Sequence, residues 1–283
     1  MPELPEVETI VRALREGGRE GPPIVGSTIK GARVYWKRTI AEPGVAAFKD
    51  RISGQRVQAV RRRGKFIVFQ LSSGTLLFHL RMSGDLKVEK YAKPNGKSSP
   101  AQAHDRLILD FTNGKQMIFN DTRKFGRVWL VKDARTVLEG LGPEPLDPAL
   151  TPKSFFTMLN SKSRQLKPLL LDQNFLAGLG NIYSDEALHL AKLHPLLDSR
   201  DVTLEQATTL LKSIRRVLRE GIKRNGASID WVYRGGDFQN YFRLYQRTGE
   251  PCPVCGTPVQ RIVLGQRGTH FCPNCQSLQE EKG

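Results

Sequence analysis

The chain has 283 residues, which is enough for two domains with separate hydrophobic cores. Lys and Arg outnumber Asp and Glu by 44 to 28, and the formal net charge of +16 indicates a polyanionic partner, with nucleic acid favoured over an acidic membrane surface. The sequence contains neither an apolar run of the roughly 20 residues that a bilayer span requires nor a signal peptide, so we expect an intracellular protein without membrane segments.

The first predicted element is an amphipathic helix over residues 5–17. Pro5 suits the first turn of a helix, and acidic residues near that turn are favoured by the helix dipole. Apolar residues recur at the spacing of one helical face, at Val7, Ile10, Val11 and Leu14. Burial of this face would anchor the start of the chain against a core.

From about residue 26 to residue 132 the pattern changes to short β-rich runs separated by turn signals such as Ser73-Gly74 and Asn113-Gly114. Eight runs are predicted strands: 27–36, 56–62, 66–71, 75–80, 86–89, 106–111, 116–119 and 128–131. Eight short strands with no helix between them indicate a β-sandwich or a flattened barrel. Residues 90–104 are predicted to form a surface loop.

The second half of the chain is predicted to be helical. Residues 135–152 are rich in Pro and Gly and are interpreted as an interdomain linker. On this interpretation the N-terminal domain spans residues 1–134, a helical domain spans 153–243, and residues 244–283 form a third, small domain.

Two helix starts in this half have clear capping signals. Thr151-Pro152 provides an N-cap and a first-turn proline, and Thr203 with Gln206 forms a capping box before a long apolar-periodic run. Asn181 is expected to start a further helix over 182–192, where free backbone N–H groups would favour a phosphate.

All four cysteines lie within residues 252–283, in two Cys-x-x-Cys pairs separated by the sixteen residues 256–271: Cys252, Cys255, Cys272 and Cys275. This spacing is typical of four-thiolate zinc sites. Because four thiolates complete the tetrahedral shell, we expect one structural Zn²⁺ that takes no part in catalysis.

The start of the chain offers a nucleophile. If Met1 is removed, Pro2 becomes a terminal secondary amine, and α-amino groups titrate near neutrality, so part of it would be uncharged. Attack on a sugar aldehyde carbon would give an iminium that has no N–H to lose and stays cationic. Glu3 and Glu6 are close enough in sequence to transfer protons. The alternative is that these Pro-Glu pairs only mark a helix start.

The first nine residues, Met-Pro-Glu-Leu-Pro-Glu-Val-Glu-Thr, resemble the start of the formamidopyrimidine-DNA glycosylases, bacterial enzymes that remove oxidised purines. Leu4 favours this branch over the related endonuclease VIII branch, which typically has Gly there. Four further motifs resemble those of the family and follow in family order. The resemblance implies an α+β fold: a leading helix with a β-sandwich, then a helical domain with a helix–two-turn–helix, and a zinc-finger hairpin.

Three segments of the first half resemble motifs with roles at the lesion. The first segment, residues 62–65, has the pattern R-x-G-K, and the resemblance implies that Lys65 reaches into the active site. The alternative is that this segment is a solvated basic hairpin edge. H-L-x-M-x-G implies that Met82 fills the void of an extruded base and that His79 contacts a phosphate; otherwise Met82 is a half-buried apolar filler. The third segment, residues 120–126, has the pattern N-D-x-R-x-F-G, and the resemblance implies that Arg123 pairs with the orphaned base while Phe125 pries apart the neighbouring base step. If the segment is extended, the side chains of Arg123 and Phe125 lie on one side of it. The alternative is an ordinary turn with Phe125 in the core.

Further positions in the second half take roles from the same resemblance. Asn181 would grip the damaged strand, although it could also be a simple helix cap. Arg267, near the tip of the hairpin at 265–268, would clamp a phosphate or else be an ordinary surface arginine. Residues 226–243 are expected to form a mobile loop in which Tyr241 contacts a phosphate. Gln246 departs from the Gly usual at this position, which leaves the local backbone open.

The resemblance implies a bifunctional DNA glycosylase and abasic-site lyase that acts as a monomer on double-stranded DNA containing an oxidised base, in the bacterial cytoplasm and in association with the nucleoid. Pro2 would form a Schiff base at C1′, Glu3 would assist proton transfer to the opening sugar ring, and Glu6 would position or buffer the amine. β,δ-elimination would follow. The alternatives are an endonuclease VIII-type enzyme for oxidised pyrimidines and a zinc-ribbon DNA-binding protein without catalysis.

Overall fold

The computed structural model describes residues 1–18, 21–90, 100–228 and 235–278. The chain divides into two compact units. The N-terminal unit comprises Met1–Glu139 together with Asn225–Gly236, and the C-terminal unit comprises Gly140–Arg224 together with Asp237–Gly283. A short segment from the second half of the chain therefore belongs to the N-terminal unit.

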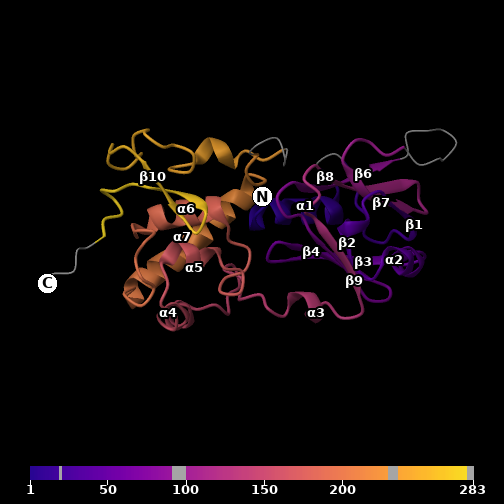
Figure 1. Ribbon diagram of the computed structural model, residues 1–283, viewed down its shortest axis with the longest axis horizontal. Coiled ribbons are helices and arrows are strands. Elements are labelled where there is room, and N and C mark those ends of the chain that lie inside the picture. Colours follow the sequence, from indigo (N-terminus) through magenta and orange to yellow (C-terminus); the bar gives the residue numbers. More distant parts are fainter. Residues whose placement is uncertain (19–20, 91–99, 229–234, 279–283) are drawn as a thin grey trace. The chain divides into compact units, whose positions relative to one another are not determined.

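Two sheets build the N-terminal unit (Figure 1). The first has the strand order β1-β7-β8-β6 and the second has the order β2-β9-β5-β4-β3. All pairings are antiparallel except that of β2 with β9. The strands are β1 Ile29–Val34, β2 Ile40–Glu42, β3 Val57–Arg63, β4 Phe66–Leu71, β5 Thr75–His79, β6 Gly84–Lys90, β7 Asp105–Phe111, β8 Lys115–Asp121 and β9 Arg127–Val131.

The two sheets face each other across one apolar core. Phe78 on β5 and Phe119 on β8 come from different sheets, yet their ring centroids lie 5.6 Å apart in an edge-to-face arrangement. Alternating residues of both sheets contribute to the same buried cluster, as expected where each strand turns one face inward. The predicted β-sandwich is confirmed, and so are its eight predicted strands, apart from small shifts at their ends.

The leading helix α1 (Leu4–Glu16) covers part of this sandwich and packs against β3, β4 and β6. Its predicted apolar face is buried, with all four side chains at most 2% exposed: Val7, Ile10, Val11 and Leu14. Burial of each such side chain contributes roughly 1.5–3 kcal/mol relative to exposure. Arg62 on β3 also donates to Glu8 at 2.9 Å, which fixes α1 on the strand that leads to Lys65.

The expectation that no helix interrupts the β-rich region was wrong. Helix α2 (Val45–Ile52) follows β2, a short strand that was also missed, and a 3₁₀ turn, η1 (Lys37–Thr39), precedes β2. Only Phe48 and Ile52 of α2 are buried, four residues apart. An eight-residue helix with two apolar anchors gives too short a periodic signal to recognise in sequence. A further short helix, α3 (Arg135–Leu138), follows β9.

The C-terminal unit is helical and ends in a hairpin (Figure 1). Both predicted capping signals are confirmed: Thr151 caps its helix through Ser154 N, and Thr203 forms a capping box with Gln206. Helices α4 and α6 pack on the long helix α7. The elements are α4 Pro152–Asn160, α5 Leu166–Leu171, α6 Asn181–Ala191, α7 Leu204–Lys223, the 3₁₀ turn η2 Phe238–Tyr241, β10 Gln260–Leu264 and β11 Arg267–Phe271.

Two consecutive turns connect α5 to α6 and form the helix–two-turn–helix. The side chain of Gln173 holds these turns in place. Its Nε2 donates to the carbonyls of Leu171 and Leu179 at 2.9 and 2.8 Å, and its Oε1 accepts the N–H of Gly178 at 2.9 Å. Gly178 has φ +97°, a conformation that favours glycine. Gly178 therefore allows the chain to turn here, and Gln173 fixes that turn.

The hairpin of β10 and β11 turns through two residues, Gly265 and Gln266, which both have positive φ. Gln246, which precedes the hairpin, also has a positive φ of 61°. Gln246 therefore adopts the left-handed backbone conformation that glycine, the usual residue at this position, adopts most easily. No helix within the described ranges is long and apolar enough to cross a membrane.

Two predicted loops fall partly on positions that the structure does not describe. Residues 91–99 of the predicted surface loop at 90–104 lie outside the described residues, and so do residues 229–234 of the predicted mobile loop at 226–243.

Candidate functional site

The first residues of the chain are held tightly in the N-terminal unit. Pro2 is buried, and Glu3 is only 2% exposed. Glu3 is the N-cap of α1, and Glu6 reaches back so that its Oε2 accepts the Glu3 N–H at 2.7 Å, which is one half of a capping box. The backbone next to Pro2 is thus fixed by a buried carboxylate and by the helix that follows.

Glu6 also reaches a distant part of the chain. Its Oε1 accepts the N–H of Ala227 at 2.8 Å. The neighbouring Gly226 has φ +80°, and a Cβ placed there would lie 2.6 Å from the same oxygen, so only glycine fits against this carboxylate. The structure shows both Glu6 oxygens accepting backbone N–H groups. That this residue positions the terminal amine stays a prediction.

Lys65 and His79 lie together on the sandwich. Lys65 follows Gly64 in the turn from β3 to β4 and is 5% exposed, so it is not part of a solvated hairpin edge. His79 is the register partner of Phe66 on the neighbouring strand. Burial lowers the pKa of His79 from 6.5 to about 3, and the charges of Arg81 and Lys65 add to this effect.

His79 is therefore a neutral imidazole near pH 7. Its Nδ1 accepts the backbone N–H of Arg81 at 3.1 Å, so the ring proton resides on Nε2. A neutral N–H donor can bind a phosphate oxygen, although it brings no charge.

The depressed pKa of His79 predicts an acid-sensitive fold. Because the unfolded chain binds this proton first, the stabilisation is complete above pH 6.5 and is lost as the pH falls towards 3. At pH 4.5 the loss from this residue is roughly 2–3 kcal/mol. In urea unfolding, the difference in unfolding free energy between wild type and His79→Asn should shrink by that amount from pH 7 to pH 4.5. The exposed His104→Asn is the control, and an unchanged difference for His79→Asn would contradict the assignment.

Arg123 and Phe125 form a pair on the segment after β8. The Arg123 Cζ lies 5.1 Å from the Phe125 ring centroid. Phe125 is 49% exposed, so the alternative that it lies in the core is wrong. The segment is not extended, because Lys124 has φ +62°. The assumed extended geometry was therefore wrong, and the two side chains meet across a tight turn. Met82, which is half-buried, lies in the turn between β5 and β6.

Asn181 and the hairpin of Arg267 are joined in the C-terminal unit. Gly180 is the N-cap of α6, so Asn181 is its first residue and not its cap. The Asn181 Nδ2 donates to the Gly268 carbonyl at 3.0 Å, next to the exposed Arg267. The first turn of α6 and the exposed Arg267 therefore lie close together at one end of this helix.

Buried charges fix this arrangement. Lys167 on α5 and Asp185 on α6 are fully buried and form an ion pair, and Asp185 Oδ2 also accepts the His270 N–H of β11 at 3.0 Å. Tyr241 lies elsewhere in the unit. It is 46% exposed, and the Arg224 guanidinium carbon lies 3.1 Å from its ring centroid. The predicted phosphate role of Tyr241 stays a prediction.

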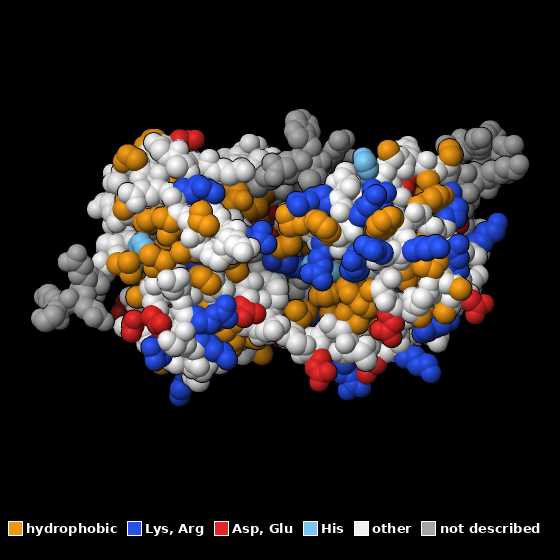
Figure 2. Space-filling model, in the orientation of Figure 1, with side chains coloured by type: hydrophobic (Ala, Val, Ile, Leu, Met, Phe, Trp, Pro, Cys, Tyr) orange, Lys and Arg blue, Asp and Glu red, His pale blue; other side chains and the backbone are white. Residues whose placement is uncertain are grey.

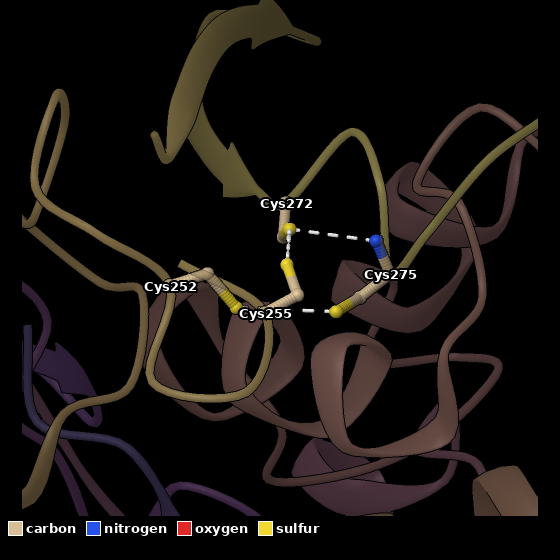
Figure 3. Close-up of side chains that lie close together, drawn as sticks. All are labelled: Cys252, Cys255, Cys272 and Cys275. Atoms are coloured by element: carbon tan, nitrogen blue, oxygen red, sulfur yellow. Dashed lines mark hydrogen bonds between the residues drawn. The ribbon is translucent and has the colours of Figure 1, made fainter. Parts of the chain in front are cut away.

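The four cysteines form a cluster, which Figure 3 shows. Their sulfur atoms all lie within 4.8 Å of one another; Cys252 and Cys275 are 3.9 Å apart and Cys255 and Cys272 are 3.4 Å apart. Tetrahedral Zn–S bonds of about 2.3 Å place sulfurs roughly 3.8 Å apart, so this donor set fits one Zn²⁺.

The zinc cluster is tied to α6 of the same unit. His189 lies with Nε2 3.4 Å from the Cys252 sulfur. Glu186, one turn earlier, accepts the N–H groups of Arg243, Leu244 and Tyr245, which lead into the cysteine-containing segment. Sequence reasoning missed this carboxylate because nothing in a helix interior indicates a partner nearly sixty residues away.

Positive charge is concentrated on the surface of the N-terminal unit. Figure 2 shows Lys and Arg side chains gathered on the face of this unit that is turned to the viewer. Together with the net charge of +16, this distribution favours a polyanion as partner.

Comparisons with known proteins agree with this architecture. Three family models match the chain: "Formamidopyrimidine-DNA glycosylase N-terminal domain" over residues 1–128, "Formamidopyrimidine-DNA glycosylase H2TH domain" over 141–232, and "Zinc finger found in FPG and IleRS" over 249–278. A formamidopyrimidine-DNA glycosylase of Protochlamydia amoebophila is 41% identical over 285 residues, which cover 98% of this chain and 99% of the relative.

Solved structures are also similar to this chain. The Lactococcus lactis Fpg (MutM) bound to DNA containing N7-benzyl-Fapy-dG has a TM-score of 0.88 at 35% identity, and the match covers 98% of this chain and 100% of that chain. MutM in complex with carbocyclic 8-oxo-G containing DNA has a TM-score of 0.87 at 36% identity, with the same coverage.

These similarities place the chain among the DNA glycosylases that carry a zinc finger. It belongs to the formamidopyrimidine-DNA glycosylase family. The resemblance and the α+β fold predicted from sequence are confirmed, and the cysteine cluster binds one structural zinc ion.

Proposed function

We propose that this protein is a base-excision repair enzyme that removes oxidised purines, 8-oxoguanine and formamidopyrimidines, from double-stranded DNA and then cleaves the resulting abasic site. Its membership of the glycosylase family and the DNA lesions bound by its structural relatives support this function. We place its action in the bacterial cytoplasm, on nucleoid DNA, and as a monomer.

The chemistry begins at Pro2. After removal of Met1, the lone pair of the Pro2 nitrogen attacks C1′ of the damaged nucleotide, the bond from C1′ to the base breaks, and the base leaves with a proton. Glu3 serves the proton transfer that opens the sugar ring, and the product is a C1′ iminium. The observation that carries this proposal is the burial of both Pro2 and Glu3 at the start of a packed helix.

Elimination follows from the cationic iminium. It withdraws electrons from C2′, so a C2′ proton is lost and the 3′ phosphate departs. A second elimination releases the 5′ phosphate. Lys65, buried on the β3–β4 turn, supplies a positive charge that would stabilise these phosphates.

Access to C1′ requires the base to leave the stack, which costs a few kcal/mol and leaves a void. We assign the filling of this void to Met82, Arg123 and Phe125. A guanidinium can donate to the acceptor edge of the orphaned base, and the exposed Phe125 ring can enter the neighbouring step.

Binding of the DNA backbone falls to residues of both units. Asn181 at the start of α6 and Arg267 on β11 bind phosphates of the damaged strand, His79 offers a neutral donor, and Tyr241 adds a further contact. The zinc ion holds the hairpin that carries Arg267 and supplies no chemistry to the reaction.

Borohydride trapping tests this function. The protein is incubated with duplexes containing 8-oxoguanine, formamidopyrimidine, thymine glycol or no lesion, and the imine is reduced to a stable adduct. We expect adducts with the two oxidised purines and none with undamaged DNA. A protein whose Pro2 is blocked by an N-terminal extension should form none.

The other outcomes separate the alternatives. Preference for thymine glycol would indicate an endonuclease VIII-type enzyme. DNA binding without any adduct would indicate a zinc-ribbon binding protein. An adduct that forms equally well with Pro2 blocked would show that another residue is the nucleophile.

A further inference from the structure

We propose that Asp121 is a positioning residue that holds the Met82 turn and the Arg123–Phe125 turn together as one void-filling unit. This inference rests on the proposed function, which assigns void filling to those three side chains. Asp121 closes strand β8 and is fully buried at 0% exposure. It does not itself touch the DNA in this proposal.

The Asp121 carboxylate bonds to both turns. Its Oδ1 accepts the hydroxyl of Ser83, the residue after Met82, and also the Arg123 N–H at 3.2 Å. Its Oδ2 accepts the Gly126 N–H at 2.7 Å. The Ser83 Oγ in turn accepts the Arg123 N–H at 3.0 Å, so the two turns also bond directly to each other beside the carboxylate.

A second contact between the turns lies on the ring of Phe119, two residues before Asp121 on β8. A Cβ on Gly84 would lie 2.8 Å from Phe119 Cε2, and a Cβ on Gly126 would lie 2.3 Å from Phe119 Cζ. Both backbones therefore close on the same buried ring, and only glycines allow this approach. The two glycines that end the two motifs serve one packing site.

These contacts imply that the two turns move together. A buried carboxylate that loses a hydrogen-bond donor pays a large desolvation cost, so neither turn can shift without disturbing the other. Arg123 has a backbone N–H bound to Ser83 and Asp121, while its side chain remains over Phe125. The network thus fixes the backbone positions from which the side chains of Met82, Arg123 and Phe125 project, and it does not bind the tips of these side chains.

Asp121→Asn tests the inference, because it keeps the shape of the side chain and replaces one acceptor oxygen by a donor. Under single-turnover conditions we expect excision of a paired 8-oxoguanine to slow roughly tenfold. Cleavage of a preformed abasic site, where no base has to be extruded, should slow by less than about threefold. Ser83→Ala, which removes the direct link to Arg123, should change the ratio of the two rates in the same direction.

A double-mutant cycle separates positioning from general loss of structure. The cycle adds Asp121→Asn to the Arg123→Ala variant. If Asp121 acts through the Arg123 turn, this addition should slow excision by less than about twofold, although the same substitution slows the wild-type enzyme about tenfold. Asp110→Asn is the matched control, since Asp110 lies on β7 of the same sheet and pairs with Arg33 on β1. It should leave the ratio of the two rates unchanged.

Several results would overturn the inference. Equal slowing on both substrates, additive effects with Arg123→Ala, or an unchanged excision rate in Asp121→Asn would each do so. Failure of the proposed function is distinguishable, because then the wild type itself would give no borohydride adduct with either oxidised purine.

Discussion

Replacing Glu3 by Gln should lower the rate of base excision by about 10²–10⁴-fold, the range that a positioned acid or base contributes. Glu3 is 2% exposed, directly follows Pro2 and is the N-cap of α1, so the first turn of the helix fixes its side chain at the start of the chain. Glutamine has the same shape but cannot carry the proton. The measurement is single-turnover release of 8-oxoguanine from a duplex.

The Glu3→Gln result has an internal control and a matched variant. On a preformed abasic site no base has to leave and the sugar ring opens to its aldehyde without the enzyme, so borohydride should still trap an adduct on Pro2 and the loss should be much smaller. Glu16→Gln, at the exposed end of the same helix, should behave as wild type. If Glu3→Gln retains more than a tenth of the wild-type excision rate, the role assigned to Glu3 is wrong.

Loss of zinc should have the second large effect, a fall of at least about 100-fold in affinity for lesion-containing DNA. Structural zinc contributes roughly 10–16 kcal/mol to the folding of small four-ligand domains. Without it, the hairpin β10–β11 should lose its place beside α6, and Arg267 would be lost from the phosphate site that we propose there. Cys272→Ser should have this effect, since Cys272 is fully buried.

Two measurements check the zinc prediction. Metal analysis should give one zinc per wild-type chain and none for Cys272→Ser, and fluorescence anisotropy with a labelled lesion duplex should give the loss of affinity. Val254→Ala is the control, because this side chain lies in the first knuckle and is 60% exposed. Wild-type affinity in a zinc-free protein would refute the structural role of the metal.

Local patterns predicted most elements of this fold. The helix α1 followed from its apolar periodicity, and the strands followed from β-rich runs between turn signals. The helix α2 was missed because only Phe48 and Ile52 mark its buried face. The cysteine spacing predicted the zinc site before any geometry was known, since two knuckles suffice to define a tetrahedral donor set.

The candidate site was predictable only in part, because its contacts are long-range. Pro2 and Glu3 could be selected from their chemistry, whereas the roles of Met82 and Arg123 came from resemblance. The assumption of an extended segment failed at Lys124, whose positive φ turns the chain between Arg123 and Phe125. No local pattern indicates that Asp121 accepts from residues on two turns, because strand register decides which residues meet.

The bond between Glu6 and Ala227 also bears on how the protein can be divided. The segment Asn225–Gly236 belongs to the N-terminal unit, so the chain enters that unit a second time. A fragment cut at Glu139 would keep every strand of the sandwich but would lose the Ala227 donor to the Glu6 carboxylate. The amide hydrogen of Ala227, through its exchange with solvent, therefore reports on whether the N-terminal segment that carries Glu6 is intact.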